Sequence, residues 1–314
     1  MLFVSAEDCG RVLDVPGVLA AVEDALRMDA AGTVRWSEPR SMVVTGRPPG
    51  SRVRVKASAL GDPTVAGIRV LVFNEEVDTR WVLLFDDATG EPRAIVDEAW
   101  TYPQRSIASV ALLAHRLRAG SVDRVGLVGA GRIARAALPY IDHLFPGSDL
   151  AVSSRREETR GEVAALARER YGIAATPVPV EEAVRGSQVV LACTGASTAV
   201  LRDGWIGPGT VVGSLETTEC GSELYAAADL RVVDSREQLA GELAEAYGPE
   251  APGRVDASMA EVVTGAHPGR ADGAQRILVL SQGLVSQDVL LAARAYREAA
   301  TRGLGTDLPI PTAE

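Results

Sequence analysis

The segment Val125-Gly-Leu-Val-Gly-Ala-Gly-Arg-Ile-Ala134 decides the fold class of this chain. Its last six residues have the pattern G-x-G-x-x-A, which here follows a short apolar strand and opens a predicted helix. The first glycine permits a tight turn, the second lets the backbone approach a pyrophosphate, and the small third residue lets helix and strand pack closely. The helix N-terminus then faces the phosphates with free N–H groups. The segment predicts a dinucleotide site of the Rossmann type, and a glycine turn that binds no ligand is the alternative. The residues predicted to contact the cofactor are Gly129, Ala130, Gly131, Arg132 and Ile133.

Strands and helices alternate on the C-terminal side of this segment. Such alternation is typical of a doubly wound parallel sheet. On the N-terminal side we expect a helix over 6–30, short strands within 52–95 and a helix over 104–118. The predicted fold class is therefore α/β, a Rossmann doubly wound parallel sheet plus a second, α+β domain. The strands predicted after residue 120 are 124–128, 149–153, 189–193, 210–213, 230–233 and 277–280, with helices at 157–171 and 287–302.

The composition limits the class of protein. A length of 314 residues suits two domains. The net charge of −10 argues against nucleic-acid binding, which needs a positive surface. Cys9, Cys193 and Cys220 lie far apart in the sequence, so we expect neither a metal site nor a disulfide framework. With no visible signal peptide and no apolar run long enough for a membrane span, the expectation is a cytoplasmic protein.

The end of the second Rossmann strand indicates the type of nicotinamide cofactor. NAD-binding folds usually place Asp or Glu there to hold the ribose hydroxyls. This chain instead reads Val152-Ser-Ser-Arg-Arg156, in which Ser154, Arg155 and Arg156 can bind a 2′-phosphate. The prediction is NADP(H). NAD(H) is the alternative, because the segment can equally be the solvated start of a helix.

A second segment of the same half is also a candidate for cofactor contact. Cys193-Thr194-Gly195 ends a later predicted strand. In open α/β sheets that end lies at the ligand crevice, where these residues can border the nicotinamide ribose. A plain turn at the end of a strand is the alternative.

Cations mark the N-terminal half. Arg52, Arg54 and Lys56 alternate with apolar residues, so a strand places all three on one face. We interpret Arg52 and Arg54 as solvated, and the role of Lys56 stays open. Arg105 falls at the predicted start of an apolar helix, where a cation opposes the helix dipole. An anion bridging the helix start and Arg105 would remove that penalty, which favours a site for a substrate carboxylate.

A series of short segments runs in a fixed order along nearly the whole chain. In order they are Pro39-Arg40, Val55-Lys56, Ala66-Gly-Ile-Arg69, Phe85-Asp-Asp-Ala-Thr-Gly-Glu-Pro92, Trp100-Thr-Tyr-Pro-Gln-Arg-Ser-Ile-Ala-Ser109, the glycine segment, Glu182-Ala-Val-Arg-Gly-Ser-Gln-Val-Val190, Trp205-Ile-Gly-Pro-Gly209, Val233-Asp-Ser235 and Gly283. This ordered set resembles the ornithine cyclodeaminase/mu-crystallin family. The fifth segment, for example, is similar to the family's Leu-Thr-x-x-Arg-Thr-Ala-Ala-x-Ser.

The resemblance implies a domain layout and a set of roles. It implies a substrate-binding and dimerisation domain over 1–120, a Rossmann domain over 121–282 and a C-terminal helix within 283–314 that returns to the first domain. It implies that Arg40, Lys56 and Arg105 hold the substrate carboxylate and that the protein is a homodimer. Cations beside Lys56 would lower its pKa, so we expect Lys56 also to relay protons. The chemistry implied is hydride exchange with a nicotinamide at Cα of a small amino acid, or of the imine of a keto acid.

One loop departs from the family pattern. Cyclodeaminases of the family carry an Asp within Gly-x-Asp-x-Pro-Gly-Lys-x-Glu-Leu, whereas this chain reads Gly213-Ser-Leu-Glu-Thr-Thr-Glu-Cys-Gly-Ser-Glu-Leu224. Glu216 is the nearest acid and our catalytic candidate, Glu219 is a second candidate, and surface charge is the alternative for both.

The function expected from these features is that of an NAD(P)H-dependent oxidoreductase of an amino acid or its imine. Its reaction would be imine reduction, amino-acid dehydrogenation or secondary-amine oxidation as in diaminopropionate biosynthesis. An ornithine or lysine cyclodeaminase and a non-catalytic NADPH-binding protein are the alternatives.

Overall fold

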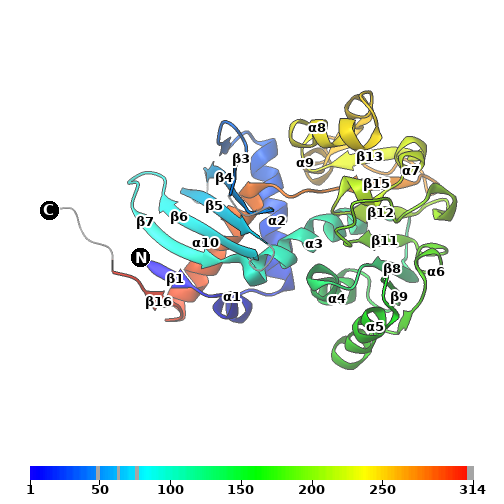
Figure 1. The fold of residues 1–314 in the computed structure, drawn as a ribbon, viewed down its shortest axis with the longest axis horizontal. Coiled ribbons are helices and arrows are strands. Elements are labelled where there is room, and N and C mark those ends of the chain that lie inside the picture. The colour runs from blue at the N-terminus through cyan, green and yellow to red at the C-terminus, as the bar shows by residue number, and fades with distance from the viewer. Residues whose placement is uncertain (47–49, 62–63, 75–77, 310–314) are drawn as a thin grey trace. The chain divides into compact units, whose positions relative to one another are not determined.

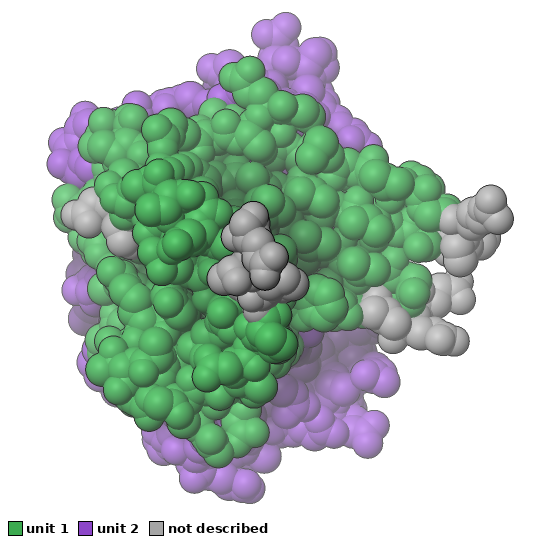
Figure 2. Space-filling view, turned by 90° about the vertical axis from the view of Figure 1, so that its left-hand side faces the viewer, with its two compact units in different colours: residues 1–105, 284–314 green, residues 106–283 purple. Residues whose placement is uncertain are grey.

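The computed structural model describes residues 1–46, 50–61, 64–74 and 78–309 of the chain, which divides into two compact units. Unit 1 comprises Met1–Arg105 and Leu284–Glu314, and unit 2 comprises Ser106–Gly283. Figure 2 draws both ranges of unit 1 in green and unit 2 in purple. The sequence placed the first boundary at residue 120. The boundary instead falls inside a single helix, α3 (Glu98–Leu117), which continues from one unit into the other.

Unit 2 is built on a sheet whose described strands all pair in parallel. In spatial order the strands are β10 (Ala175–Pro177), β9 (Asp149–Ser153), β8 (Arg124–Val128), β11 (Val189–Ala192), β12 (Val211–Ser214), β15 (Ile277–Leu280), β13 (Leu230–Val233) and β14 (Ala257–Ser258). The chain runs outward from β8 to β10 and then returns to β11 on the other side of β8. The strand order therefore reverses between β8 and β11, and ligands bind at such a reversal in open α/β sheets. The predicted doubly wound parallel sheet is confirmed.

Helices connect these strands, as Figure 1 shows. They are α4 (Arg132–Leu144), α5 (Glu157–Tyr171), α6 (Val180–Val184), α7 (Ser222–Ala227), α8 (Arg236–Tyr247) and α9 (Met259–Thr264), with short 3-10 turns η1 (Asp203–Trp205), η2 (Thr217–Glu219) and η3 (Pro252–Arg254). Strands β11, β12 and β15 are buried along their whole length, which explains why they read as continuous apolar runs. No described helix is long and apolar enough to cross a bilayer.

Unit 1 contains a mixed sheet. In spatial order its strands are β16 (Thr306–Asp307), β1 (Leu2–Val4), β7 (Pro92–Asp97), β6 (Asp78–Asp86), β5 (Val65–Phe73), β4 (Arg52–Leu60) and β2 (Val34–Trp36), and β3 (Met42–Thr45) also pairs with β4. Only the β1–β7 pair is parallel among the described strands. Strands β1 and β16 lie side by side, so the C-terminal segment joins the sheet that the N-terminus begins (Figure 1).

One face of this sheet is covered by helix α10 (Val285–Thr301) and is called the inner face here. Its buried residues include Leu60, Val82 and Leu84, which share a core with Val289. At Gly67 of β5, a Cβ would lie 2.5 Å from the Val289 side chain, so only glycine permits this approach of helix to sheet. The return of α10 to the first unit therefore buries the inner face, whereas Met42, Val44, Ile68 and Trp81 are exposed on the opposite, outer face.

Two predicted helices differ from those observed. The helix predicted over 6–30 is two helices, α1 (Ala6–Val12) and α2 (Val15–Ala30). The break is local, because Asp14 caps α2 by accepting a hydrogen bond from the Gly17 N–H and proline follows at the start of that helix. Helix α3 begins at Glu98, well before the predicted residue 104, because Asp97 accepts from the Ala99 N–H and the helix continues through Pro103.

Candidate functional site

The glycine turn of unit 2 lies at the carboxyl end of β8, where the strand order reverses. Gly129 has φ +128°, and a Cβ there would lie 2.6 Å from the carbonyl oxygen of Cys193. A side chain is therefore excluded by both conformation and space. Gly131 is the N-cap of α4, no side chain caps that helix, and a Cβ on Gly131 would meet nothing within 4 Å. This open cradle before free N–H groups fits a pyrophosphate.

The residues predicted to choose the cofactor follow β9. Arg155 and Arg156 are both exposed, and Arg156 is the N-cap of α5 without a side-chain capping bond. The Ser154 hydroxyl donates to the carbonyl oxygen of Arg156 (2.7 Å) and lies 2.7 Å from the Thr159 hydroxyl. Arg160, which the sequence did not single out, donates from Nη1 to the Ser154 carbonyl oxygen at a distance of 3.5 Å. Three arginines thus gather directly after β9, and Ser154 shapes the turn.

Cys193, Thr194 and Gly195 follow β11, beside the glycine turn. Cys193 is buried, and burial raises the pKa of its thiol well above the ordinary value, so it is a packing residue and no nucleophile. Thr194 is exposed, but its backbone N–H and its hydroxyl both donate to the carboxylate of Glu219. These two donors are therefore occupied within the protein.

The structure separates the two loop glutamates. Glu219 is fully buried, and its carboxylate also accepts from the Ser214 hydroxyl at 2.6 Å and from the Leu215 N–H at 3.2 Å. This carboxylate ties the ends of β11 and β12 together and has no free face. Glu216 is exposed at the end of β12, and its carboxylate accepts from the Gln282 side-chain amide at 3.3 Å. Of the two candidates, only Glu216 can reach a ligand.

Gln282 is itself held firmly after β15. The buried carboxylate of Asp234 accepts from the backbone N–H groups of Gln282 (2.7 Å) and Gly283 (2.6 Å). The Gly283 carbonyl oxygen accepts from the side-chain amide of Gln238. Asp234 therefore fixes the segment that presents Gln282 to Glu216.

Unit 1 carries a buried group of charges on and near its inner face. We call Lys56, Arg69, Glu98, Arg105 and Asp288 the ionic cluster. Arg69 of β5 is 3% exposed, donates from Nε to Glu98 Oε2 at 2.7 Å and lies 3.4 Å from Asp288 Oδ2. Arg105 of α3 donates from Nε to Asp288 Oδ1 at 2.5 Å. Asp288 of α10 thus pairs with two arginines.

Charge and burial set the protonation of this cluster. Burial alone would lower the pKa of Arg69, but the Asp288 and Glu98 carboxylates outweigh it and hold that pKa above the ordinary value. Burial raises the pKa of Glu98 to about 6, against the opposing effect of Arg69.

Lys56 lies opposite Arg69 in the β4–β5 register. Burial lowers its pKa, the Asp288 carboxylate opposes that shift, and the neighbouring guanidinium groups add to it. A lysine in this setting is suited to proton transfer.

Three guanidinium groups lie close to the aromatic ring of Tyr102. The guanidinium carbons of Arg80, Arg105 and Arg69 lie 4.0, 5.0 and 5.4 Å from the centroid of the Tyr102 ring. The electron-rich face of the ring favours cations close to it. Arg69 Nη2 is buried and has no hydrogen-bond partner among the described residues, although Nε is paired. A donor of this kind fits a carboxylate brought in by a ligand.

Two predictions about the cations need correction. Arg105 is not at a helix start. It lies well inside α3, so the dipole argument was wrong, and Asp288 supplies the anion. Arg54 is half-buried and shares the inner face with Lys56, so it is not part of a solvated face. Arg52 is exposed, as predicted.

Arg40 has a position of its own. Its guanidinium carbon lies 4.7 Å from the Trp36 ring centroid, and Trp36 pairs in β2 with Ser58 of β4. Arg40 also acts on the Asp29 carboxyl of α2, where it opposes the rise in pKa that burial causes.

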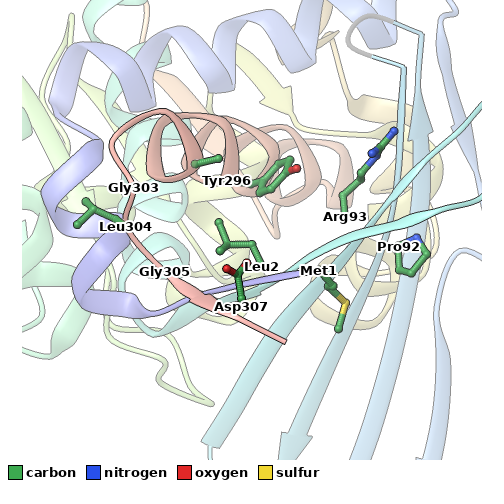
Figure 3. Close-up of a pocket in the computed structure, with 10 residues that line it drawn as sticks. Met1, Leu2, Pro92, Arg93, Tyr296, Gly303, Leu304, Gly305 and Asp307 are labelled. Atoms are coloured by element: carbon green, nitrogen blue, oxygen red, sulfur yellow. The ribbon is translucent and has the colours of Figure 1, made fainter. Parts of the chain in front are cut away.

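A cavity of about 400 Å³ in unit 1 lies elsewhere (Figure 3). It is lined by Met1, Leu2, Pro92, Arg93, Tyr296, Ala300, Gly303, Leu304, Gly305 and Asp307. None of these residues belongs to the ionic cluster, and we assign this cavity no role. Within the described part of the chain, no group of His, Cys, Asp and Glu is arranged to hold a metal ion.

The sequence matches the model of the ornithine cyclodeaminase/mu-crystallin family over residues 2–303. The chain belongs to this family. The family resemblance inferred from the sequence is therefore confirmed.

Several members of the family are similar to this chain. The NAD(P)H-dependent anabolic L-arginine dehydrogenase DauB of Pseudomonas aeruginosa is 30% identical over 232 residues, 70% of this chain and 71% of the relative. Thermococcus litoralis Δ(1)-pyrroline-2-carboxylate reductase, solved with NADH and L-proline, has a TM-score of 0.90 at 24% identity, with 98% of this chain and 100% of that chain covered. An archaeal alanine dehydrogenase dimer with bound NAD has a TM-score of 0.87 at 23% identity, with 98% and 99% covered. The predicted enzyme class, nicotinamide-dependent oxidoreductases of amino acids or imines, is the class of these relatives.

Sequence reasoning missed Arg69, Glu98 and Asp288 as site residues. One signal was available for Arg69, which stands within the otherwise apolar strand Val65–Phe73 at an inward position. An arginine there must be buried, and buried arginines are paired. The partner Asp288 is 183 residues from Arg105 in the sequence, and no local pattern connects the two.

Proposed function

We propose that this member of the family is an NADP(H)-dependent oxidoreductase that interconverts an amino acid and its imine. The observation that carries the proposal is the ionic cluster. Arg69 and Arg105 are buried there, and the Asp288 carboxylate pairs with both of them. The half-buried Lys56 belongs to the same cluster. An α-carboxylate bound by these cations fixes Cα, and fixing the reacting carbon is the entropic part of catalysis. The free Arg69 Nη2 donor supports this role.

The chain's own residues would supply proton transfer. The nicotinamide, when bound, accepts or supplies the hydride at the substrate Cα. Lys56 takes the proton that the substrate nitrogen loses when the C–N single bond becomes an imine, and it returns that proton in reduction. Its lowered pKa makes the Lys56 ammonium a stronger acid than that of an ordinary lysine, which favours return of the proton in reduction. Glu216, the exposed loop acid, orients the substrate nitrogen or the water that hydrolyses the imine.

NADP(H) is proposed as the cofactor over NAD(H). Gly129, Ala130, Gly131, Arg132 and Ile133 would surround the pyrophosphate, and Arg155 and Arg156 would pair with the 2′-phosphate. The support for this choice is that these two arginines are exposed and that no acid stands at the end of β9. Cys193 and Gly195 would contact the nicotinamide end of the cofactor through van der Waals packing. Thr194 would add no hydrogen bond, because its N–H and hydroxyl already donate to Glu219.

We also propose that the protein is a homodimer formed through the outer face of the unit 1 sheet. Apolar side chains are exposed there, among them Met42 (51%), Val44 (64%), Ile68 (36%) and Trp81 (43%). Adjacent apolar residues of this kind mark an interaction surface. A Trp81→Glu variant is expected to sediment as a monomer, whereas dimers of this variant as stable as those of the native protein would contradict the proposal.

A binding assay followed by a turnover assay tests the function. We expect NADPH to bind at least tenfold more tightly than NADH, and an Arg155→Ala, Arg156→Ala double variant to lose that preference. We expect NADPH to be consumed when a 2-oxo acid and an amine are supplied together. Failure of both nicotinamides to bind would overturn the proposal. Tight binding without turnover across such pairs would favour the non-catalytic alternative.

A further inference from the structure

Arg54 is a cation without an assigned role beside the ionic cluster. It lies two residues before Lys56 on β4, so both side chains leave the strand on the inner face, about 7 Å apart along the strand. In the register Arg54 is opposite Leu71, which is 5% exposed, and Lys56 is opposite Arg69. Arg54 is therefore half-buried at the border of the cluster, not in bulk solvent.

The neighbours of Arg54 do not neutralise it. Within the described residues, no carboxylate lies at ion-pair distance from its guanidinium. Arg80, on the far side of Leu71, pairs with Asp78 at 2.8 Å, so Asp78 is already engaged. Burial is the main cause of the lowered pKa of Lys56, and the Arg54 charge adds to it.

The charges of the ionic cluster and of Arg54 do not cancel one another. The ionic cluster has three cations and two carboxylates, which leaves one positive charge when Lys56 is protonated. Arg54 adds a second. The α-carboxylate of the substrate cancels only one of them. An uncompensated charge in a partly desolvated site is costly, so a second anionic group on the ligand would be stabilised.

We propose that Arg54 determines specificity by binding a second carboxylate of the substrate, so that this chain acts on a dicarboxylic amino acid or the corresponding imine. This inference rests on the proposed function of the ionic cluster. The same guanidinium repels a substrate whose side chain ends in an ammonium group. Arg54 therefore also acts against ornithine and lysine, the substrates of a cyclodeaminase.

Binding of isosteric pairs tests the proposal without requiring turnover. The probes are L-glutamate against L-glutamine and L-aspartate against L-asparagine, each titrated by calorimetry into the protein saturated with NADP⁺. Within each pair only the charge of the side-chain group changes. The native protein is expected to bind the acid roughly 10- to 100-fold more tightly than the amide. This ratio is the gain in affinity expected from one hydrogen bond to a charged group.

Variants of β4 identify the residue responsible. Arg54→Gln is expected to remove the preference for the acid and to leave affinity for the amide within about twofold, because the α-carboxylate site is untouched. Arg54→Lys is expected to restore part of the preference. Arg52→Gln is the matched control, an exposed arginine on the same strand and face, and it should behave like the native protein.

The outcomes separate the two proposals. Equal affinity of the native protein for acid and amide, or equal loss of both in Arg54→Gln, would overturn the role of Arg54 while the proposed function stood. If neither member of a pair binds and NADPH is not consumed with any 2-oxo acid and amine, the proposed function fails, and the Arg54 proposal fails with it. Turnover with 2-oxoglutarate and ammonium exceeding that with 2-oxopentanoate would support Arg54 independently.

Discussion

The two units build their sites in different ways. In unit 2 the proposed cofactor site is mostly backbone, and the glycine turn comes from six consecutive residues whose conformation excludes side chains at Gly129. In unit 1 the proposed substrate site consists of charged side chains from β4, β5, α3 and α10, and its longest-range ion pair, between Arg69 and Asp288, spans 219 residues of sequence. A backbone site depends on local conformation, whereas a side-chain site depends on the whole fold being closed. The two sites should therefore fail separately when they are mutated.

The largest expected effect separates substrate chemistry from cofactor binding. Arg105→Gln should lower kcat/KM roughly 100- to 1,000-fold, because it removes one cation from the carboxylate site and leaves Asp288 with one arginine fewer. The dissociation constant for NADPH should change by less than about twofold. Steady-state kinetics and a cofactor titration check both values. Parallel loss of cofactor affinity would contradict the separation of the two sites.

The two loop glutamates should differ in the property that they control. Glu219→Gln should lower the free energy of unfolding by about 3 kcal/mol, because a carboxylate that accepts several hydrogen bonds in a buried position loses half of its acceptor capacity. Glu216→Gln should leave that free energy within about 0.5 kcal/mol, since its side chain is exposed, and should reduce turnover. Chemical denaturation and kinetics measure the two effects. The opposite pattern would show that the two roles are exchanged.

The two glycines of the turn provide a matched pair within unit 2. Gly129→Ala should lower the free energy of unfolding by about 2 kcal/mol, from a positive φ and from the contact with the Cys193 carbonyl. Gly131→Ala meets nothing within 4 Å in the protein, so stability should be unchanged while NADPH affinity falls roughly tenfold. Thermal melts with and without NADPH distinguish them. A stable Gly131→Ala protein with native cofactor affinity would argue against a phosphate at this cradle.

The smallest effect concerns the pH dependence of unit 1. The pKa of Glu98 rises from 4.5 to about 6 on folding, so its contribution to stability is present below about pH 4.5 and is lost as the pH rises through about 6. The loss amounts to about 2 kcal/mol. In Glu98→Gln, the amide oxygen can still accept from Arg69, and that pH-dependent loss should disappear. Denaturation at a series of pH values measures it, and an unchanged slope in the variant would assign the titration to another group.

The sequence predicted the fold of unit 2 well, because its features are local. Strands 124–128, 149–153, 230–233 and 277–280 agree with the structure residue for residue, since parallel strands that are buried over most of their length read as apolar runs between breaks. The helix over 6–30 was wrong because a break at an Asp cap interrupts an otherwise continuous apolar pattern. Helix α3 was placed too late, since it continues through Pro103 and begins six residues before the predicted start.

The site of unit 1 was predictable only in part. The sequence singled out Lys56 and Arg105, and both belong to the ionic cluster. Asp288 was not, because a carboxylate in the first turn of a helix has an ordinary local explanation, and only the return of α10 to the inner face gives it two arginine partners. Arg54 was taken for a solvated residue because strand alternation tells which residues share a face but not which face is covered.

Hydride transfer itself is the most direct test of the proposed function. The protein is incubated with NADPH carrying deuterium at the transferable position, together with a 2-oxo acid and ammonium, and the amino-acid product is examined by mass spectrometry and NMR. We predict one deuterium at Cα of the product, with dicarboxylic 2-oxo acids the best substrates and with the label absent in Arg105→Gln under the same conditions. Tight binding of NADPH with no deuterium transferred to Cα from any pair of 2-oxo acid and amine would contradict the proposed reaction.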